Sequence, residues 1–322
     1  MNLNPVFIGG VERSGTSLLY ALLASHPNLA MTRRTNFWPY FYNRYGDLSQ
    51  GVNLDRCLNV MKNYRRTIEL DLDYEKLKYD FCQGETTYPR LFALIWSQFA
   101  ERIDKPRWGD KSLNTERYAH LIFSNYPKAK ILHIIRDPRD RYASALKRWK
   151  VIRGGAGSGT AMWLNSISLA KRNLKNFPNQ YKVVRYESLA SNPEGTLRDV
   201  CSFIGEEYTP EMLSMRGAER FRDEGGNSSF EPHEVGKISP VSVGRFRKTL
   251  SKRAIAYIQL MAGTEMSAYG YPLDDVSLPM KDRLLFFFVD LPLNLARGGT
   301  WSGREVYLDY AGRPIPTNRL VA

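Results

Sequence analysis

The chain has 322 residues, of which 46 are Lys or Arg and 33 are Asp or Glu, so its formal net charge is +13. With 43% hydrophobic and 25% charged residues, it has the composition of a globular protein, which excludes disordered and collagen-like chains. The positive excess favours an anionic partner: nucleic acid, an acidic membrane surface, or a ligand with several phosphate or sulfate groups. The alternative is a basic surface that contacts only water.

Three widely spaced cysteines, Cys57, Cys82 and Cys201, form no C-x-x-C pair and have no histidine at ligand spacing. This pattern predicts neither a disulfide framework nor a zinc site. The N-terminus lacks the pattern of a secretory signal, and the most apolar stretch, 284–289, is far shorter than the roughly 20 residues that span a bilayer. We therefore expect a cytoplasmic protein without a transmembrane segment.

Continuous apolar runs predict strands at residues 6–8 and 131–135, and a third strand is predicted at 182–186, before the Asn192 cap. Helical spacing predicts helices after the first strand and at about 53–65, 74–102, 139–150 and 159–176, with a further helix capped by Asn192. Strands that alternate with helices indicate an α/β fold around a central parallel sheet. Two glycine-containing stretches, 154–159 and 222–244, predict loops.

The first predicted strand leads into G-V-E-R-S-G-T-S at residues 10–17, which has the glycine spacing of a P-loop. In such a loop, backbone N–H groups and a helix N-terminus hold a phosphate. The lysine of metal-dependent P-loop enzymes is missing, because Thr16 follows the second glycine and the cation is Arg13. The strand 131–135 ends in Arg136, where a kinase would need a carboxylate. The sequence therefore predicts an anion held by cations and hydroxyls, without a metal.

The stretch R-D-P-R-D-R-Y-A-S carries Arg136 at the end of the second predicted strand and Ser144 two turns into the next helix. Both side chains are expected at the crevice where open α/β sheets bind ligands. Nine Lys or Arg lie between 128 and 153. A solvated helix face explains several of them, so only Arg136 and Ser144 are assigned to a ligand.

Together these segments resemble the sulfotransferases that use 3′-phosphoadenosine 5′-phosphosulfate, especially their bacterial and tyrosylprotein branch. The resemblance covers about residues 5–272 and implies a P-loop NTPase-like fold. R-S-G-T-S resembles the 5′-phosphosulfate loop of that family, and I-I-R-D-P-R-D-R-Y-A-S resembles its 3′-phosphate motif, with Arg136 and Ser144 eight residues apart. The residues that inherit the 5′-phosphosulfate role are Arg13, Ser14, Gly15, Thr16 and Ser17.

Three further segments resemble the same family. The first is V-V-R-Y-E-S, which implies that Tyr186 contacts the adenine. The second is P-V-S-V-G-R-F-R-K, which makes Arg245 and Arg247 candidates for the 3′-phosphate. W-G-D-K is in register with a catalytic lysine of the tyrosylprotein branch, which falls on Lys111. The resemblance implies one sulfotransferase domain over 1–275, followed by a C-terminal extension, 276–322, without an assigned role.

Sulfuryl transfer fits these residue types, because cationic side chains stabilise the leaving phosphate oxygen without a divalent ion. Arg13 and Lys111 are assigned that role. The attacking acceptor, a hydroxyl or amine, also needs a general base. Where related enzymes often carry a glutamate, this sequence has Arg34. Glu85 is the first substitute and Asp110 the second, with a structural role for Asp110 equally open. His133, inside an apolar strand, is predicted to be a packed core residue.

Arg33 and Arg34, with the aromatic segment that follows, are expected on the acceptor side and would suit an anionic or aromatic acceptor. The alternative for that segment, Phe37, Trp38, Tyr40, Phe41 and Tyr42, is the core of an amphipathic helix. The acceptor classes left open are a small molecule, a glycan, a lipid and a peptide tyrosine. Two other functions also stay open: a P-loop kinase or NTPase, and a nucleotide-binding protein of this fold without activity. No motif for nucleic acid is present.

Overall fold

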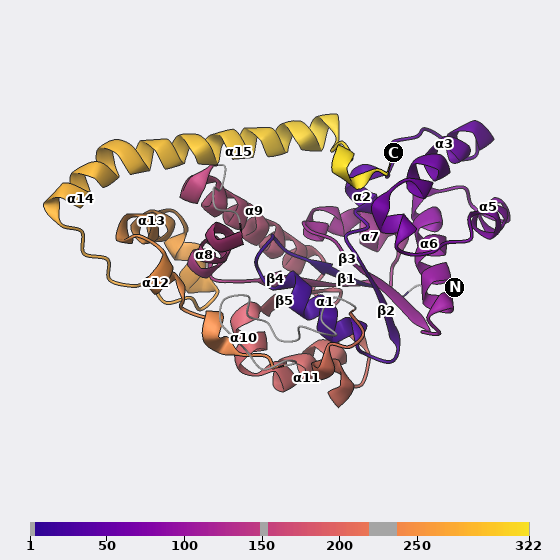
Figure 1. The fold of residues 1–322 in the computed structure, drawn as a ribbon, viewed down its shortest axis with the longest axis horizontal. Coiled ribbons are helices and arrows are strands. Elements are labelled where there is room, and N and C mark those ends of the chain that lie inside the picture. Colours follow the sequence, from indigo (N-terminus) through magenta and orange to yellow (C-terminus); the bar gives the residue numbers. More distant parts are fainter. Residues whose placement is uncertain (1–3, 149–153, 219–236, 322) are drawn as a thin grey trace.

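The computed structural model describes residues 4–148, 154–218 and 237–321. Five parallel strands form one sheet in the order β2-β3-β1-β4-β5 (Figure 1). The strands are β1 (Val6–Gly9), β2 (Leu29–Arg33), β3 (Arg107–Lys111), β4 (Lys130–Ile135) and β5 (Tyr181–Arg185). This confirms the predicted α/β fold with a central parallel sheet flanked by helices.

Alternate residues of β1 point into two different hydrophobic cores. Val6 and Ile8 belong to the core that includes α1 (Thr16–Ala24) and α11 (Pro193–Ile204). Phe7 belongs to the other core, where its ring contacts Trp96 and Trp108 edge to face, with centroids 5.6 and 6.0 Å apart. A strand buried on both faces has no polar alternation, which is why it reads as a continuous apolar run.

The remaining helices surround these cores. They are α2 (Phe37–Tyr40), α3 (Gly51–Lys62), α4 (Arg65–Ile68), α5 (Tyr74–Cys82), α6 (Tyr88–Arg102), α7 (Ala119–Asn125), α8 (Pro138–Arg148), α9 (Gly155–Asn176), α10 (Tyr186–Ser191), α12 (Phe246–Thr249), α13 (Lys252–Ala268), α14 (Met280–Leu285) and α15 (Leu291–Ala311). Short 3-10 turns include η1 (Thr115–Tyr118) and η4 (Pro240–Ser242). The predicted cap of α11 is confirmed, since the Asn192 side chain accepts a hydrogen bond from the Gly195 amide at 3.0 Å.

Two of the predicted helices are each divided in the structure. The helix expected over 74–102 is α5 and α6, because Thr87 accepts a hydrogen bond from the Arg90 amide and starts a new helix with Pro89 in its first turn. The helix expected over 53–65 is α3 followed by α4. Most of the predicted loop 222–244 lies outside the described residues.

The loop predicted over 154–159 is wrong, because α9 begins at Gly155. Its glycines serve close packing: a Cβ atom on Gly157 would lie 2.0 Å from the carbonyl oxygen of Asn294 on α15. The Gly157 amide donates instead to Oδ1 of Asn294 at 2.9 Å. Small residues here bring two helix backbones together.

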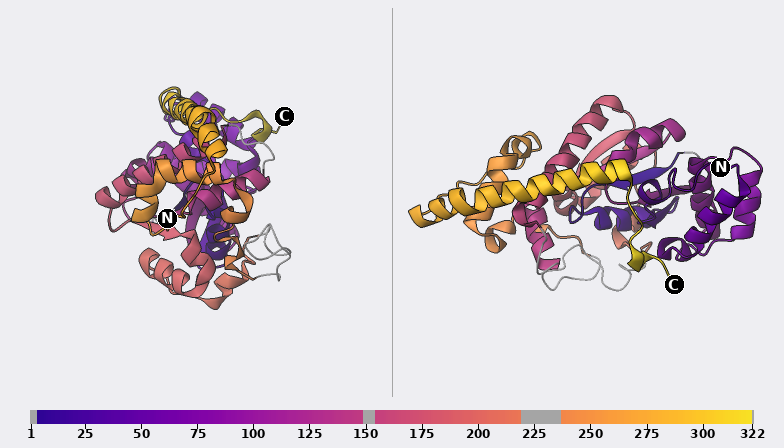
Figure 2. Two further views of the ribbon diagram at one scale, coloured as in Figure 1. Left: turned by 90° about the vertical axis from the view of Figure 1, so that its left-hand side faces the viewer. Right: turned by 90° about the horizontal axis from the view of Figure 1, so that it is seen from above.

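The C-terminal segment is a long helix that lies along the molecule (Figures 1 and 2). It comprises α14, a π-helical turn at Phe286–Asp290 and α15, and it packs on α9. Beyond it, the chain returns to α3 and α4, where the Val321 amide donates to the Asn63 carbonyl at 2.8 Å. None of the helices that the structure describes combines the length and the apolar composition needed to cross a membrane.

Candidate functional site

The carboxyl ends of the parallel strands form one edge of the sheet, and this edge carries most of the predicted site residues. The register pairs Ile8 of β1 with Lys111 of β3, and Ile135 of β4 with Arg185 of β5. Arg13 therefore follows β1, Arg136 follows β4 and Tyr186 follows β5 at the same edge. Ligands of open α/β sheets bind in the crevice at this edge.

We call residues 10–17, which follow β1, the phosphate-type loop. This loop requires backbone conformations that favour glycine. Gly10 has φ 123° and Gly15 has φ 98°. A Cβ atom on Gly15 would lie 2.4 Å from the Tyr186 ring, so only glycine fits there. Gly15 precedes α1, and the Leu18 amide donates to the Gly15 carbonyl at 3.0 Å. Among the described residues the Thr16 and Ser17 amides have no hydrogen-bond acceptor, so they are available to an anion.

The two phosphate motifs predicted from the sequence are in direct contact. Nε of Arg13 donates to Oγ of Ser144 at 3.1 Å, and Arg136 donates to the Arg13 carbonyl at 3.4 Å. Ser14 is fully buried in the same loop, and among the described residues its hydroxyl has no hydrogen-bond partner. A buried hydroxyl without a partner is costly, so its orphan state fits a loop built to receive an oxyanion.

Arg136 and Tyr186 are held together by Ser242 in η4. Arg136 donates to the Ser242 carbonyl at 2.8 Å, and the Tyr186 and Ser242 hydroxyls lie 2.6 Å apart. The Arg136 guanidinium also lies 4.2 Å from the centroid of the Tyr186 ring. Ser242 was not predicted, although it lies inside the quoted segment P-V-S-V-G-R-F-R-K.

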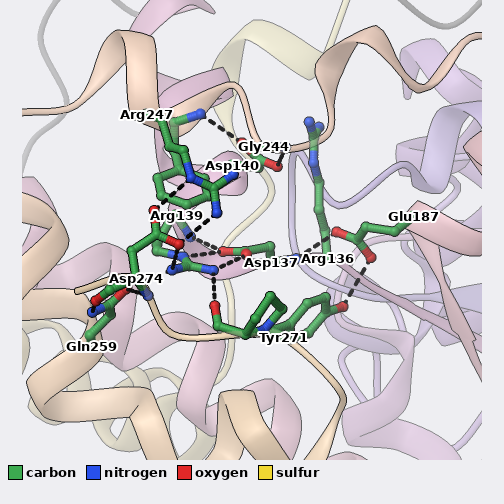
Figure 3. A network of polar contacts seen from close by, with 12 residues as sticks. Arg136, Asp137, Arg139, Asp140, Glu187, Gly244, Arg247, Gln259, Tyr271 and Asp274 are labelled. Carbon is green, nitrogen blue, oxygen red and sulfur yellow. Dashed lines mark hydrogen bonds and ion pairs between the residues drawn. The ribbon is translucent and has the colours of Figure 1, made fainter.

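The segment that carries Arg245 and Arg247 is fixed by Asp140 of α8, as Figure 3 shows. The Asp140 carboxylate accepts hydrogen bonds from the Gly244 amide at 2.6 Å and the Phe246 amide at 2.8 Å. Arg247 forms a bidentate ion pair with Asp274 at 2.5 and 2.6 Å and is half exposed. The described contacts thus join Arg247 to Asp274, and none of them joins it to Arg136 or Ser144.

Of the nine Lys and Arg between 128 and 153, Arg139 and Arg141 do not belong to a solvated helix face, because they are only 1% and 2% exposed. Arg139 binds both carboxylate oxygens of Asp137, at 2.7 and 3.0 Å (Figure 3). Arg141 donates to the backbone carbonyls of Glu12 and Gly159, and burial lowers its pKa to about 10. Arg141 therefore supports the phosphate-type loop through its hydrogen bond to the Glu12 carbonyl.

A buried acid supports the loop at its other end. Glu116 accepts hydrogen bonds from the Gly10 amide at 2.8 Å and from the Ser166 hydroxyl at 2.9 Å. His133 contacts Ser166 at 2.9 Å and the Tyr181 hydroxyl at 2.6 Å, which confirms His133 as a packed core residue. No pattern in the sequence distinguishes Glu116 from other acids.

Lys111, at the end of β3, is only 2% exposed. Burial, reinforced by the nearby Arg34 and Arg33 cations, lowers the pKa of Lys111 to about 7, although Asp110 acts in the opposite direction. Within the described ranges, its ammonium has no hydrogen bond or ion pair. A bound anion would favour the charged form of such a lysine, so the environment of Lys111 fits an anion site.

The two candidate bases differ in their surroundings. Asp110 is buried; its carboxylate oxygens each lie 2.7 Å from a hydroxyl, those of Thr32 and Ser112, and burial raises its pKa. Glu85 is exposed in the loop between α5 and α6. In the part of the chain that the structure describes, no hydrogen bond or ion pair joins Glu85 to the phosphate-type loop or to Lys111.

The aromatic segment after β2 belongs mainly to the core. Phe37, Trp38 and Phe41 are buried in the cluster around α6, so the core interpretation is correct for them. Beside the edge strand β2 lies a cavity of about 500 Å³. Its lining includes three arginines, Arg33, Arg66 and Arg102. Arg33 pairs in the sheet register with Lys111, so the cavity reaches the strand end that carries this lysine.

Comparison with known proteins identifies the family. The sequence pattern of the sulfotransferase family matches residues 5–210. The chain belongs to the sulfotransferase family. It is 24% identical over 214 residues to protein-tyrosine sulfotransferase A of Caenorhabditis elegans and 24% identical over 218 residues to the Drosophila melanogaster protein-tyrosine sulfotransferase. Both matches cover 65% of this sulfotransferase-family chain, but only 51% and 39% of the relatives.

The fold has a solved counterpart in the sulfotransferase domain of the Synechococcus PCC 7002 olefin synthase. The two structures superpose with a TM-score of 0.59 at 21% identity, over 84% of this chain and 95% of that domain. This likeness concerns the fold. The five-stranded sheet and its flanking helices are thus the architecture of a sulfotransferase.

Proposed function

We propose that this chain transfers the sulfuryl group of 3′-phosphoadenosine 5′-phosphosulfate to a hydroxyl or amine acceptor, without a metal ion. The observation that carries the proposal is the contact of Arg13 with Ser144 and Arg136, which joins the two phosphate motifs at the sheet edge. A donor with phosphates at both ends of its ribose needs two anion sites at a fixed separation. The partnerless Ser14 hydroxyl and the buried Lys111 support the same proposal.

In this proposal the first-turn N–H groups of α1, with Thr16 and Ser17, hold the 5′-phosphate. Arg136 and Ser144 hold the 3′-phosphate, and the Tyr186 ring contacts the adenine. Arg245 and Arg247 are further candidates for the 3′-phosphate. For Arg247 this requires exchange of its ion pair with Asp274 for one with the nucleotide.

The transfer breaks the bond from sulfur to the leaving phosphate oxygen and forms a bond from sulfur to the acceptor. Negative charge grows on the leaving oxygen, and Arg13 and Lys111 are proposed to stabilise it. The acceptor proton passes to a base, for which Glu85 and Asp110 stay the candidates. Each Asp110 oxygen already accepts a hydrogen bond, from the Thr32 or the Ser112 hydroxyl, so the acceptor proton must reach one of the remaining lone pairs.

The acceptor is proposed to approach along β2, past Arg33. Arg66 is paired there with Glu69 at 2.6 Å and Arg102 lies 3.9 Å from Asp71, so among the described residues Arg33 is the lining arginine without an ion pair. Arg33 suits an acceptor with negative charge, including a peptide tyrosine next to acidic residues. The two relatives named above are protein-tyrosine sulfotransferases, which supports this acceptor class.

The decisive experiment is a thermal-shift comparison of adenosine 3′,5′-bisphosphate, ATP with Mg²⁺, and NAD. A ligand at 100 times its Kd stabilises the folded state by about 2.7 kcal/mol. We expect a shift with the bisphosphate that persists in EDTA and is lost in the Arg136→Ala variant. A shift only with ATP and Mg²⁺ would favour the kinase or NTPase alternative. Binding of the bisphosphate without turnover of any acceptor would favour the inactive alternative.

A further inference from the structure

The long C-terminal helix exposes many large apolar side chains. Phe288 is 78% exposed, Phe287 59% and Leu284 52%. We call the exposed apolar side chains between 280 and 295 the apolar ridge: Met280, Leu284, Leu285, Phe287, Phe288, Val289, Leu293 and Leu295. A concentration of exposed apolar side chains on one helix marks an interaction site.

The ridge is held rigidly, because the opposite side of the same helix is packed against the domain. Phe286 is buried, and the Asn294 side chain accepts a hydrogen bond from the Gly157 amide of α9 at 2.9 Å. Arg253 of α13 forms ion pairs with Asp282 at 3.2 Å and Asp290 at 2.8 Å. The helix therefore projects with α14 at one end of the molecule (Figures 1 and 2).

The charges around the ridge have one sign. Lys281 and Arg283 lie between Met280 and Leu284 of the ridge, Arg297 follows its last member, and all three are exposed. In the ranges that the structure describes, none of their side chains forms an ion pair. The acids within 280–297, Asp282 and Asp290, are both bound by Arg253. The ridge thus combines phenylalanine and leucine with unpaired cations, the composition of a helix that lies in a membrane interface.

Charge also decides between occupants. A second copy of the chain would bring Lys281 and Arg283 against further cations, with no unpaired acid on the helix to balance them. A bilayer with anionic headgroups supplies the opposite charge, and its apolar interior accepts the exposed phenylalanine and leucine side chains. We propose that the helix from Met280 to Arg297 lies in the interface of an anionic lipid bilayer and anchors the protein there.

The test is co-sedimentation of the full chain with vesicles of phosphatidylcholine alone or mixed with phosphatidylglycerol, at 0.15 M salt. We expect binding to the mixed vesicles only. The double variant F287S/F288S should bind at least 10-fold more weakly. A matched control is Y307S/Y310S, which removes two exposed aromatic rings from the same helix beyond the ridge and should bind like the original chain. The double variant K281E/R283E should also weaken binding.

Three results would overturn the proposal. One is an equal affinity for both kinds of vesicle. Another is vesicle binding that F287S/F288S leaves unchanged, because the net charge alone would then explain it. The third is an absence of vesicle binding together with a dimer in analytical ultracentrifugation that F287S/F288S dissociates. Thermal melting of each variant, with and without adenosine 3′,5′-bisphosphate, checks that the fold is intact. The anchoring proposal does not depend on the proposed catalytic activity.

Discussion

Lys111 combines deep burial with a cationic neighbourhood. Its pKa is lowered to about 7, first by burial and then by the Arg34 and Arg33 cations. Between pH 7 and 10.5 the unfolded chain binds a proton there that the folded chain lacks, so stability rises with pH in this window. Below about pH 7 both states are protonated, and the folded state carries the full cost of the buried charge. Such a cost indicates a lysine kept for chemistry.

The first prediction follows from this cost. Lys111→Met removes a buried cation and keeps much of the side-chain volume, so the variant should melt at a higher temperature at pH 6. Its sulfuryl-transfer rate should fall by about 100-fold or more, because a donor to the leaving oxygen is lost. Thermal melting and turnover measure the two effects, and Lys76→Met, at an exposed site on α5, is the control. A drop in both melting temperature and rate would instead assign Lys111 to the fold.

The pH profile tests the charge state of Lys111. If the cation acts, kcat/KM should fall as pH rises through about 7, since this parameter reports the free enzyme. Lys111→Arg should remove that limb, because a guanidinium stays protonated throughout the range. A rise of kcat/KM through pH 7 would mean that neutral lysine acts as the base.

Glu116 carries a second prediction at this scale. Glu116→Gln replaces the charged acceptor of the Gly10 amide, and hydrogen bonds to charged groups contribute about 1.5–3 kcal/mol. The Kd for adenosine 3′,5′-bisphosphate should rise by about 10-fold, as measured by calorimetry. Tyr181→Phe removes a hydroxyl from the far end of the same network, so it should lower stability without weakening the ligand. Equal affinity in the two variants would contradict a positioning role for Glu116.

At the scale of elements, the sequence predicted three of the five strands, β1, β4 and β5, and missed β2 and β3. β1, β4 and β5 were found to within one residue. β3, R-W-G-D-K, has no apolar run, because Arg107 is buried in an ion pair with Glu206 at 2.8 Å and Asp110 contacts buried hydroxyls. Partners from other elements make these charges compatible with burial, and a single sequence does not reveal partners.

The C-terminal tail provides the prediction at this scale. Deleting 312–322 removes the hydrogen bond from Val321 to Asn63 and the ion pairs of Arg313 with Glu305 and Asp309. The free energy of unfolding, measured by urea titration, should fall by about 1–3 kcal/mol. Affinity for the bisphosphate should be unchanged, because the tail contacts α3 and α4 and not the phosphate motifs. Arg313→Ala, which keeps the tail, should show only part of the loss. An unchanged unfolding midpoint in the deletion would rule out a structural role for the tail.

At the scale of the whole molecule, the cationic residues that make up the positive excess lie in several different environments. Arg139 and Arg141 are buried in internal contacts, Arg13 and Arg136 lie at the sheet edge, and other cations flank the apolar ridge. The positions of Arg13, Arg136 and Ser144 after predicted strands placed them at one crevice, and the resemblance to sulfotransferases added Tyr186. Neither observation predicted Ser242, which joins two of them, because only the tertiary fold brings the segment around η4 over the crevice.

The last prediction separates local charge from net charge. At 0.1 M salt, charges farther apart than about 10 Å are largely screened. The double variant K281E/R283E lowers the formal net charge from +13 to +9, since two cations become two anions (13 − 4 = 9). Its association rate constant for adenosine 3′,5′-bisphosphate at 0.15 M salt should stay within about 2-fold of the original chain. Arg245→Glu changes the net charge by only two, yet should slow association by about 10-fold, because it reverses a cation proposed to face the 3′-phosphate. Stopped-flow measurements at 0.02, 0.15 and 0.5 M salt provide the comparison. If the rate instead follows the net charge in both variants, the whole surface steers the nucleotide and Arg245 has no special place in its capture.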